Sequence, residues 1–233
     1  MRFPSPLQRC VLERRYKRFL ADVAFEDGSR ATAHCPNPGS MMGVAPANAP
    51  AWVSTSASKT RKLPLTLELV DVDGGLVAIN TNNPNKIAAE AIAAGRVAEL
   101  PADATLRREV PYGASSRIDI LLEADDGAQT FVEVKNVHLM REAGLAEFPD
   151  SVTARGAKHL RELAAVAAAG ARAVMFFVVQ RSDCVRFRPA ADLDPTYART
   201  LAEAANAGVE LICYDCEIST EDITLRRPLA IEL

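Results

Sequence analysis

The 233-residue chain has no apolar run long enough to cross a bilayer. A transmembrane helix needs about 20 consecutive apolar residues, and the longest apolar runs here, such as 173–179, are far shorter. The first residues also lack the apolar stretch and the small-residue cleavage site of a secretory signal. The sequence therefore predicts a cytoplasmic protein without a membrane role.

Cysteine is scarce, and its spacing does not form a disulfide framework. The five cysteines are an odd number spread along the chain, which predicts reduced thiols. Cys213 and Cys216 have CxxC spacing, but no second pair or histidines accompany them, so they are interpreted as strand residues. The chain also lacks a GxxxxGK[ST] phosphate loop and a glycosidase-like carboxylate pair, which argues against a small-molecule or sugar enzyme.

Charge is unevenly distributed along a chain whose net charge is only −3. Residues 1–62 carry ten Lys and Arg against four Asp and Glu, whereas the remainder carries a net charge of −9. Such basic clusters are either a solvated surface or the contact surface of a polyanion. We predict that six of these residues contact nucleic acid: Arg14, Arg15, Lys17, Arg18, Arg61 and Lys62.

Short apolar segments separated by turns occupy the first 80 or so residues. Strands are expected at 19–25, 30–35, 51–55, 65–70 and 75–80. About five strands with basic loops and no long helix favour a small β-barrel, of which the OB-fold is a nucleic-acid-binding example. The sequence thus predicts an OB-like domain over residues 1–82.

Helical periodicity begins near residue 83, so residues 83–233 are predicted to form a second domain. Helices are expected at 83–95, 152–169 and 195–207, and strands at 117–123, 130–137, 173–179 and 209–214. The nearly continuous apolar strand 173–179 implies burial on both faces. This pattern predicts an α/β domain with a mixed sheet flanked by helices.

Three charged residues stand on two neighbouring predicted strands. Residues two apart on a strand share a face, so Glu133 and Lys135 point the same way, and Asp119 joins them from the preceding strand. Burying unpaired charge costs several kcal/mol, so the cluster is either a salt-bridged surface or a functional site. We predict that Asp119 and Glu133 ligate Mg²⁺ or Mn²⁺ and that Lys135 lies beside the water that attacks a phosphodiester.

Two neighbouring helices are predicted to complete this cluster. The upstream helix supplies Glu90 as a further acidic catalytic residue, and Glu109 is the rival for that role. The helix over 152–169 has an apolar face and, opposite it, a polar face at i, i+3, i+4 and i+7. On that polar face, Arg155, Lys158 and His159 are predicted to contact a phosphate backbone.

Several motifs along the chain are typical of one bacterial family. They are 7–9, 15–23, 34–37, 115–119, 133–135, 148–150 and 153–163. Over essentially its whole length the chain resembles the sugar fermentation stimulation protein A family. The resemblance implies an OB-type domain joined to a PD-(D/E)XK nuclease-like domain, DNA binding without sequence preference, and a regulatory link to maltose metabolism.

Two functions remain open at this point. The first is a Mg²⁺-dependent nuclease that uses Asp119, Glu133, Lys135 and Glu90. The second is a DNA-binding regulatory protein that keeps the nuclease scaffold without cutting. DNA is the expected partner and RNA is the alternative, whereas no oligomeric state is predicted.

Overall fold

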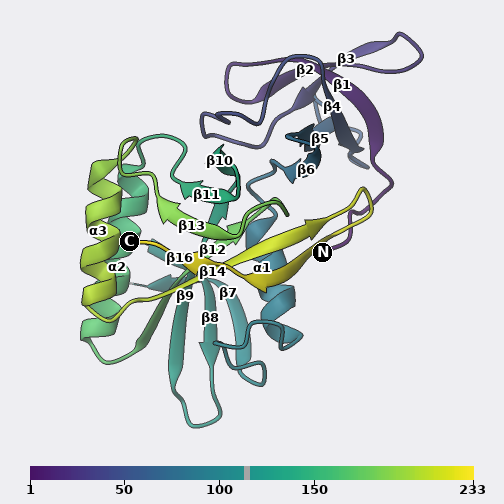
Figure 1. Cartoon of the computed structure of the whole chain (residues 1–233). Coiled ribbons are helices and arrows are strands. Elements are labelled where there is room, and N and C mark those ends of the chain that lie inside the picture. Colours follow the sequence, from purple (N-terminus) through teal and green to yellow (C-terminus); the bar gives the residue numbers. More distant parts are fainter. Residues whose placement is uncertain (113–115) are drawn as a thin grey trace.

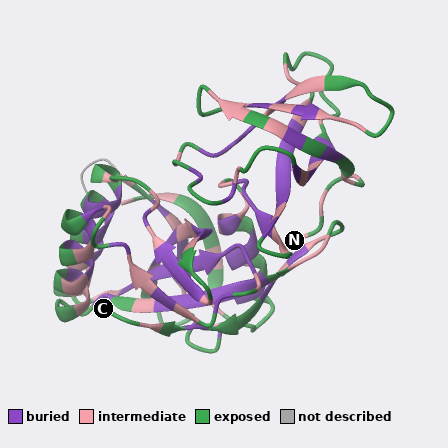
Figure 2. Cartoon of the chain, turned by 45° about the horizontal axis from the view of Figure 1, so that its top comes forward, coloured by how far each residue is buried: buried purple, intermediate pink, exposed green. Residues whose placement is uncertain are grey.

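The computed structural model describes residues 1–112 and 116–233. Ser115, which belongs to one of the family motifs, therefore lies outside the described residues. The chain folds into a β-barrel followed by a larger α/β domain (Figure 1). Buried residues fill both parts and the region where they meet (Figure 2).

Five strands close the barrel. They are β1 (Gln8–Tyr16), β2 (Leu20–Ala24), β3 (Arg30–His34), β4 (Ala49–Thr55) and β5 (Leu65–Val72). They follow the order β3-β2-β1-β4-β5, and a parallel contact between His34 and Thr66 joins β3 to β5. A sixth strand, β6 (Gly75–Ala78), extends the sheet beyond β5. The predicted small β-barrel is confirmed.

Strand β1 is the part of the barrel that the sequence did not predict. Cys10 and Leu12 point into the barrel core, whereas the residues after Leu12 are mostly charged. A strand needs only every second side chain to be apolar. Because of the arginines at the end of β1, the sequence did not indicate this half-buried strand.

The second domain is built on a six-stranded mixed sheet in the order β15-β14-β12-β9-β8-β7. Its strands are β7 (Thr105–Tyr112), β8 (Ser116–Glu123), β9 (Gln129–Val137), β12 (Arg172–Val179), β14 (Glu210–Ile218) and β15 (Ile223–Pro228). Strand β12 runs parallel to both β9 and β14, and all its residues after Arg172 are buried. The prediction of a central strand covered on both faces is confirmed.

Among the described residues, three helices cover this sheet, α1 (Pro84–Ala93) on one face and α2 (Ala154–Ala168) and α3 (Pro195–Asn206) on the other (Figure 1). The side chains of Thr153 and Asp194 cap the first turns of α2 and α3, which fixes where these helices begin. Four short strands form a separate sheet: β10 (Leu139–Glu142), β11 (Leu145–Phe148), β13 (Arg186–Pro189) and β16 (Ala230–Ile231). In the described chain, no helix is long and apolar enough to cross a membrane.

The first residues of the chain pack on the second domain although the barrel follows them in sequence. Residues 1–82 were predicted as one domain, and the end of that range falls between β6 and α1. Arg2, however, pairs with Asp222, and the backbone N–H of Phe3 donates to the carbonyl of Glu221. The first three residues therefore pack on the α/β domain, and the chain enters the barrel only afterwards.

Candidate functional site

The candidate site begins where β8 and β9 separate. Their ladder pairs Ile120–Glu123 with residues 129–132 and ends there. Beyond its end, the Asp119 carboxylate takes the place of a backbone partner, because Oδ2 accepts the N–H of Val134 at 2.8 Å. Asn85, in the first turn of α1, donates to the other oxygen of Asp119 at 2.7 Å. Asp119 is thus fixed in the gap between the two strands.

Glu133 and Lys135 lie together on β9, as their spacing predicts. The Lys135 ammonium is 2.6 Å from Glu133 Oε1, and Nδ1 of His159 on α2 hydrogen-bonds the same oxygen. Glu133 is 2% exposed. Its other oxygen, Oε2, is buried and has no hydrogen-bond partner among the described residues.

The surroundings shift the two carboxyl groups in opposite directions. Burial and the neighbouring Glu133 charge raise the pKa of Asp119 above its usual value. Burial also raises the pKa of Glu133, but hydrogen bonds and charge from His159 and Lys135 outweigh it, and the net pKa is lowered. His159 and Lys135 therefore favour the ionised form of Glu133, and the charge of Glu133 disfavours ionisation of Asp119.

The donor set fits a hard divalent cation. Mg²⁺ and Mn²⁺ prefer oxygen ligands, and Mg²⁺ keeps several of its waters. Glu133 Oε2 is an acidic oxygen without a partner, and Asp119 is the second carboxylate of the cluster. Across residues 1–112 and 116–233, no group of three or more His, Cys, Asp or Glu is placed to hold a metal ion. A cation here would take two carboxylates, with backbone carbonyl and water as further ligands.

The two candidates for a further acidic residue each have partners outside the Asp119, Glu133 and Lys135 cluster. Glu90 is an exposed residue of α1 and forms an ion pair of 2.9 Å with the amino group of Met1. Glu109 is exposed on β7 with a φ of 54°, and its carbonyl accepts a hydrogen bond from Arg117. Asn85 of α1 donates a hydrogen bond to Asp119. Asn85 was not predicted as a site residue, because an amide is not part of the acidic motif.

The polar face of α2 turns toward the cluster. His159 was predicted to contact a phosphate backbone, but it is buried against Glu133, and Arg155 Nε donates to its second ring nitrogen at 3.2 Å. Lys158 is 3.5 Å from Glu162, which also accepts a hydrogen bond from Ser116 on β8. Of the three predicted contact residues, His159 therefore belongs to the interior of the site.

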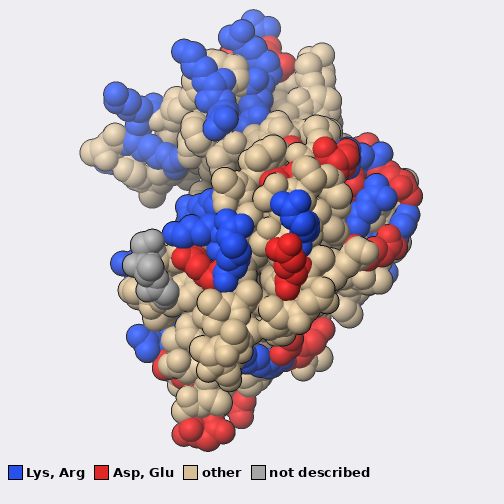
Figure 3. Space-filling model, turned by 90° about the vertical axis from the view of Figure 1, so that its left-hand side faces the viewer, with Lys and Arg blue, Asp and Glu red and all other residues tan. Residues whose placement is uncertain are grey.

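Two loops of the barrel carry exposed basic residues. Lys17 and Arg18 form the turn between β1 and β2, and Arg61 and Lys62 lie between β4 and β5. The corresponding loops border the nucleic-acid-binding face of OB-folds. Figure 3 shows Lys and Arg side chains gathered over the barrel and again on the α/β domain below it. The exposed Phe19 ring stacks on His34 beside these loops.

The remaining two predicted contact residues differ from each other. Arg14 is exposed, pairs with Asp22 at 2.8 Å and lies over the ring of Tyr16. Arg15 instead turns its guanidinium toward the barrel loop that follows β3. It donates to four backbone carbonyls, those of Arg18, Asn37, Gly39 and Ser40. Arg15 therefore holds a loop in place.

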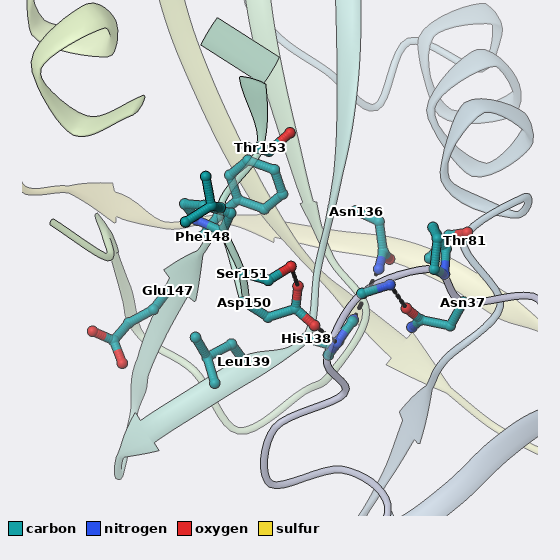
Figure 4. A pocket seen from close by; sticks show the side chains of 14 residues that line it. Asn37, Thr81, Asn136, His138, Leu139, Glu147, Phe148, Asp150, Ser151 and Thr153 are labelled. Atoms are coloured by element: carbon teal, nitrogen blue, oxygen red, sulfur yellow. Dashed lines mark hydrogen bonds and ion pairs between the residues drawn. The ribbon is translucent and has the colours of Figure 1, made fainter. Parts of the chain in front are cut away.

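A cavity of about 290 Å³ separates this loop from the α/β domain (Figure 4). Asp150 connects the barrel loop to the α/β domain beside this cavity. One of its carboxylate oxygens accepts the N–H of Met41 at 2.9 Å and lies 3.4 Å from His138. His138 in turn hydrogen-bonds Asn136, which directly follows Lys135. A chain of polar contacts thus leads from the barrel loop to the end of the Glu133–Lys135 motif.

Comparison with known proteins agrees with this architecture. The family model described as the SfsA N-terminal OB domain matches residues 14–79, and the sugar fermentation stimulation protein RE domain matches residues 82–222. The chain belongs to the sugar fermentation stimulation protein family. The predicted OB-like barrel, the predicted α/β domain with its mixed sheet, and the predicted family are confirmed.

Relatives and a solved structure match the whole chain. The sugar fermentation stimulation protein homologue of Paramagnetospirillum magneticum is 55% identical over 100% of this chain and 98% of its own length. That of Rhodospirillum centenum is 56% identical over 99% of both chains. The structure of Pyrococcus furiosus SfsA in complex with Ca²⁺ is 30% identical, with a TM-score of 0.89 over 100% of this chain and 98% of that one.

Proposed function

We propose that the protein binds DNA without sequence preference and hydrolyses phosphodiester bonds at a Mg²⁺- or Mn²⁺-dependent site. The observation that carries this proposal is the buried, unpartnered Oε2 of Glu133, beside Asp119 and next to the Lys135 ammonium. An acidic oxygen left unpaired in the interior is costly, and a cation removes that cost. The relative from Pyrococcus furiosus, whose structure contains Ca²⁺, supports a divalent cation in this family.

The residues around the cluster have separable roles in this proposal. Asp119 and Glu133 Oε2 would hold the cation, and a bound cation would supply polarisation of a phosphoryl oxygen and a lowered pKa for a bound water. His159 and Lys135 hydrogen-bond Glu133 Oε1, and Oε2 is left as the oxygen that would ligate the cation. The Lys135 ammonium then orients the attacking water and offsets the charge that develops on the phosphate. Asn85 and the Val134 N–H keep Asp119 in position.

Nucleic-acid binding is assigned to the exposed basic residues of the barrel and of α2. Lys17, Arg18, Arg61 and Lys62 lie in two loops of the barrel, and Arg155 is an exposed residue of α2 in the α/β domain. Contacts from Lys and Arg to phosphates carry no sequence information. RNA offers the same phosphates, so the proposal includes it as a second substrate.

One observation favours a protein that binds DNA without cutting. Glu133 Oε1 already has two partners, Lys135 and His159, and the described cluster contains only two carboxylates. A regulatory DNA-binding protein that retains the nuclease scaffold is therefore the second candidate. The family name, which refers to stimulation of sugar fermentation, is consistent with such a role.

Cleavage assays with matched variants separate these two functions. The purified protein is incubated with linear, circular and branched DNA and with RNA, in Mg²⁺, Mn²⁺ or a chelator. Lys135→Ala removes the proposed activating group, and Lys86→Ala removes an exposed lysine of α1 as the control. Metal-dependent cutting that only Lys135→Ala abolishes supports the enzyme. Binding of DNA without cutting of any substrate supports the second candidate.

A further inference from the structure

A second cavity, of about 410 Å³, lies on the outer face of β4 and β5 where the barrel meets the start of α1. Pro4, His34, Ser54, Arg61, Glu68 and Asn82 are among the residues that line it. We propose that this cavity binds one unpaired nucleobase, guanine for preference, and that the protein therefore acts on single-stranded or frayed nucleic acid. This inference rests on the proposed nucleic-acid function and names its substrate class. The phosphate contacts remain independent of sequence, and the cavity adds a preference for one unpaired base.

The base of the cavity is a buried carboxylate surrounded by neutral donors. Glu68 is 7% exposed, and its two oxygens accept hydrogen bonds of 2.8 Å from Ser54 and Asn80. A third donor, Asn83, lies at 3.5 Å. Burial raises the pKa of Glu68 more than these hydrogen bonds lower it. A carboxylate has about four acceptor positions, so Glu68 retains capacity for a donor that enters the cavity.

The walls and the rim complete the features that a nucleotide requires. Pro4 and Pro36 supply apolar walls for a flat ring. At the rim, Arg61 lies 3.1 Å from His34, on which the exposed Phe19 ring stacks. The Arg61 guanidinium at the rim can bind the phosphate of the same nucleotide, and the exposed Phe19 ring can stack on the next base.

Guanine matches the carboxylate better than the other bases. Its Watson–Crick edge presents an imino N–H and an adjacent amino group, and unpaired bases are commonly recognised on that edge. A base in a duplex keeps this edge paired, so only an unpaired or frayed base can reach Glu68. The cavity thus discriminates unpaired from paired bases and also guanine from the other bases.

The first turn of α1 connects this cavity to the candidate metal site. Asn83 lies against Glu68, whereas Asn85, two residues later, holds Asp119. A base seated on Glu68 therefore fixes the strand close to the residues that position Asp119. The cavity of Figure 4, on the other side of the junction, lacks this character: its described lining contains Glu147 and Asp150 but no Lys or Arg.

Binding of short oligonucleotides in a chelator, measured by fluorescence anisotropy, tests the inference without cleavage. The probes are a labelled oligothymidine of about 12 nucleotides, the same strand with one central guanine, and a hairpin in which that guanine is paired. The unpaired guanine is expected to raise affinity by about fivefold or more, the lower end of what one good base contact gives. The paired guanine is expected to give no such gain.

Two variants test the cavity independently, one by changing its hydrogen-bond acceptor and one by filling its mouth. Glu68→Gln replaces an acceptor oxygen by a donor and is expected to remove the preference for guanine. Ala57→Leu fills the mouth of the cavity from an exposed position, without removing a hydrogen bond or adding a ring that could stack, and is expected to have the same effect. Ala128→Leu, in the exposed turn between β8 and β9, is the control and keeps the preference.

The outcomes separate the cavity from the wider proposal. Equal affinity for all three probes, or a preference that persists in Ala57→Leu, overturns the base-binding cavity while nucleic-acid binding itself stands. Failure to retain any of the probes even at low salt overturns both. Because Ala57 is exposed, its variant remains informative even where Glu68→Gln does not fold.

Discussion

Arg15 is predicted to hold the two domains together rather than to contact DNA. Its guanidinium donates to the carbonyls of Asn37, Gly39 and Ser40 in the barrel loop, and to that of Arg18. The same loop docks on the α/β domain, where Ser40 Oγ donates to the carbonyl of Asp150 at 2.7 Å. Arg15→Ala is therefore expected to loosen the loop and, through it, the docking of Asp150.

The magnitude follows from these four bonds. A hydrogen bond from a charged donor contributes about 1.5–3 kcal/mol, but two of the four are exposed, and water replaces them at little cost. The two half-buried bonds, to Asn37 and Gly39, then account for most of the effect. Arg15→Ala should cost about 2–4 kcal/mol. Arg15→Lys should recover little of it, because an ammonium cannot reproduce the planar fork.

Denaturant unfolding and hydrogen exchange at the Met41 amide measure this effect. Faster exchange at Met41 together with the expected loss of stability supports the assignment. Exposed Lys17, in the turn after β1, is the control: Lys17→Gln should lower DNA affinity and leave unfolding unchanged. The reasoning fails if Arg15→Ala unfolds within about 0.5 kcal/mol of the parent, the range of ordinary surface substitutions.

Three further perturbations have defined outcomes. Burial raises the pKa of Asp150, but contacts with His138 outweigh it and the pKa falls from 3.8 to about 2. Ionised Asp150 therefore stabilises the fold by about 2 kcal/mol above pH 3.8, and this contribution is lost as the pH falls toward about 2. Unfolding curves measured over a pH series should show this loss in the parent protein and not in Asp150→Asn. Gly39→Ala would place a Cβ 2.5 Å from Asp150 Oδ2, so calorimetry should show about 1–3 kcal/mol of destabilisation, and unchanged stability would contradict the close approach. Lys62→Ala should weaken DNA binding and reduce the slope of log affinity against log salt by about 0.9, while an unchanged slope would remove Lys62 from the interface.

Regular apolar patterns made much of the fold predictable from the sequence. The buried strand 173–179 and the helices that became α2 and α3 were placed within one or two residues. The short strands β10, β11, β13 and β16 were not predicted, because two to four residues carry too little periodicity. Strand β7 was also missed, since most of its side chains are exposed.

The candidate site was predictable only as far as its local spacing extends. The two-residue interval between Glu133 and Lys135 places them on one face of a strand, as the structure shows. The burial of His159 could not be foreseen, because a helix face that meets a polar cluster has the same pattern as a solvated one. Three of the four partners of Arg15 lie more than 20 residues away along the chain, so its cluster with Arg14 indicated only a basic surface.

Calorimetric titration of the full chain with Ca²⁺ tests the metal site most directly, because it needs neither substrate nor turnover. The account predicts one Ca²⁺ bound per chain, with affinity reduced about tenfold or more in Asp119→Asn. Asp125→Asn, in the exposed turn between β8 and β9, should bind Ca²⁺ like the parent. A parent protein that binds no divalent cation, or an Asp119→Asn variant that binds it equally well, would contradict the account.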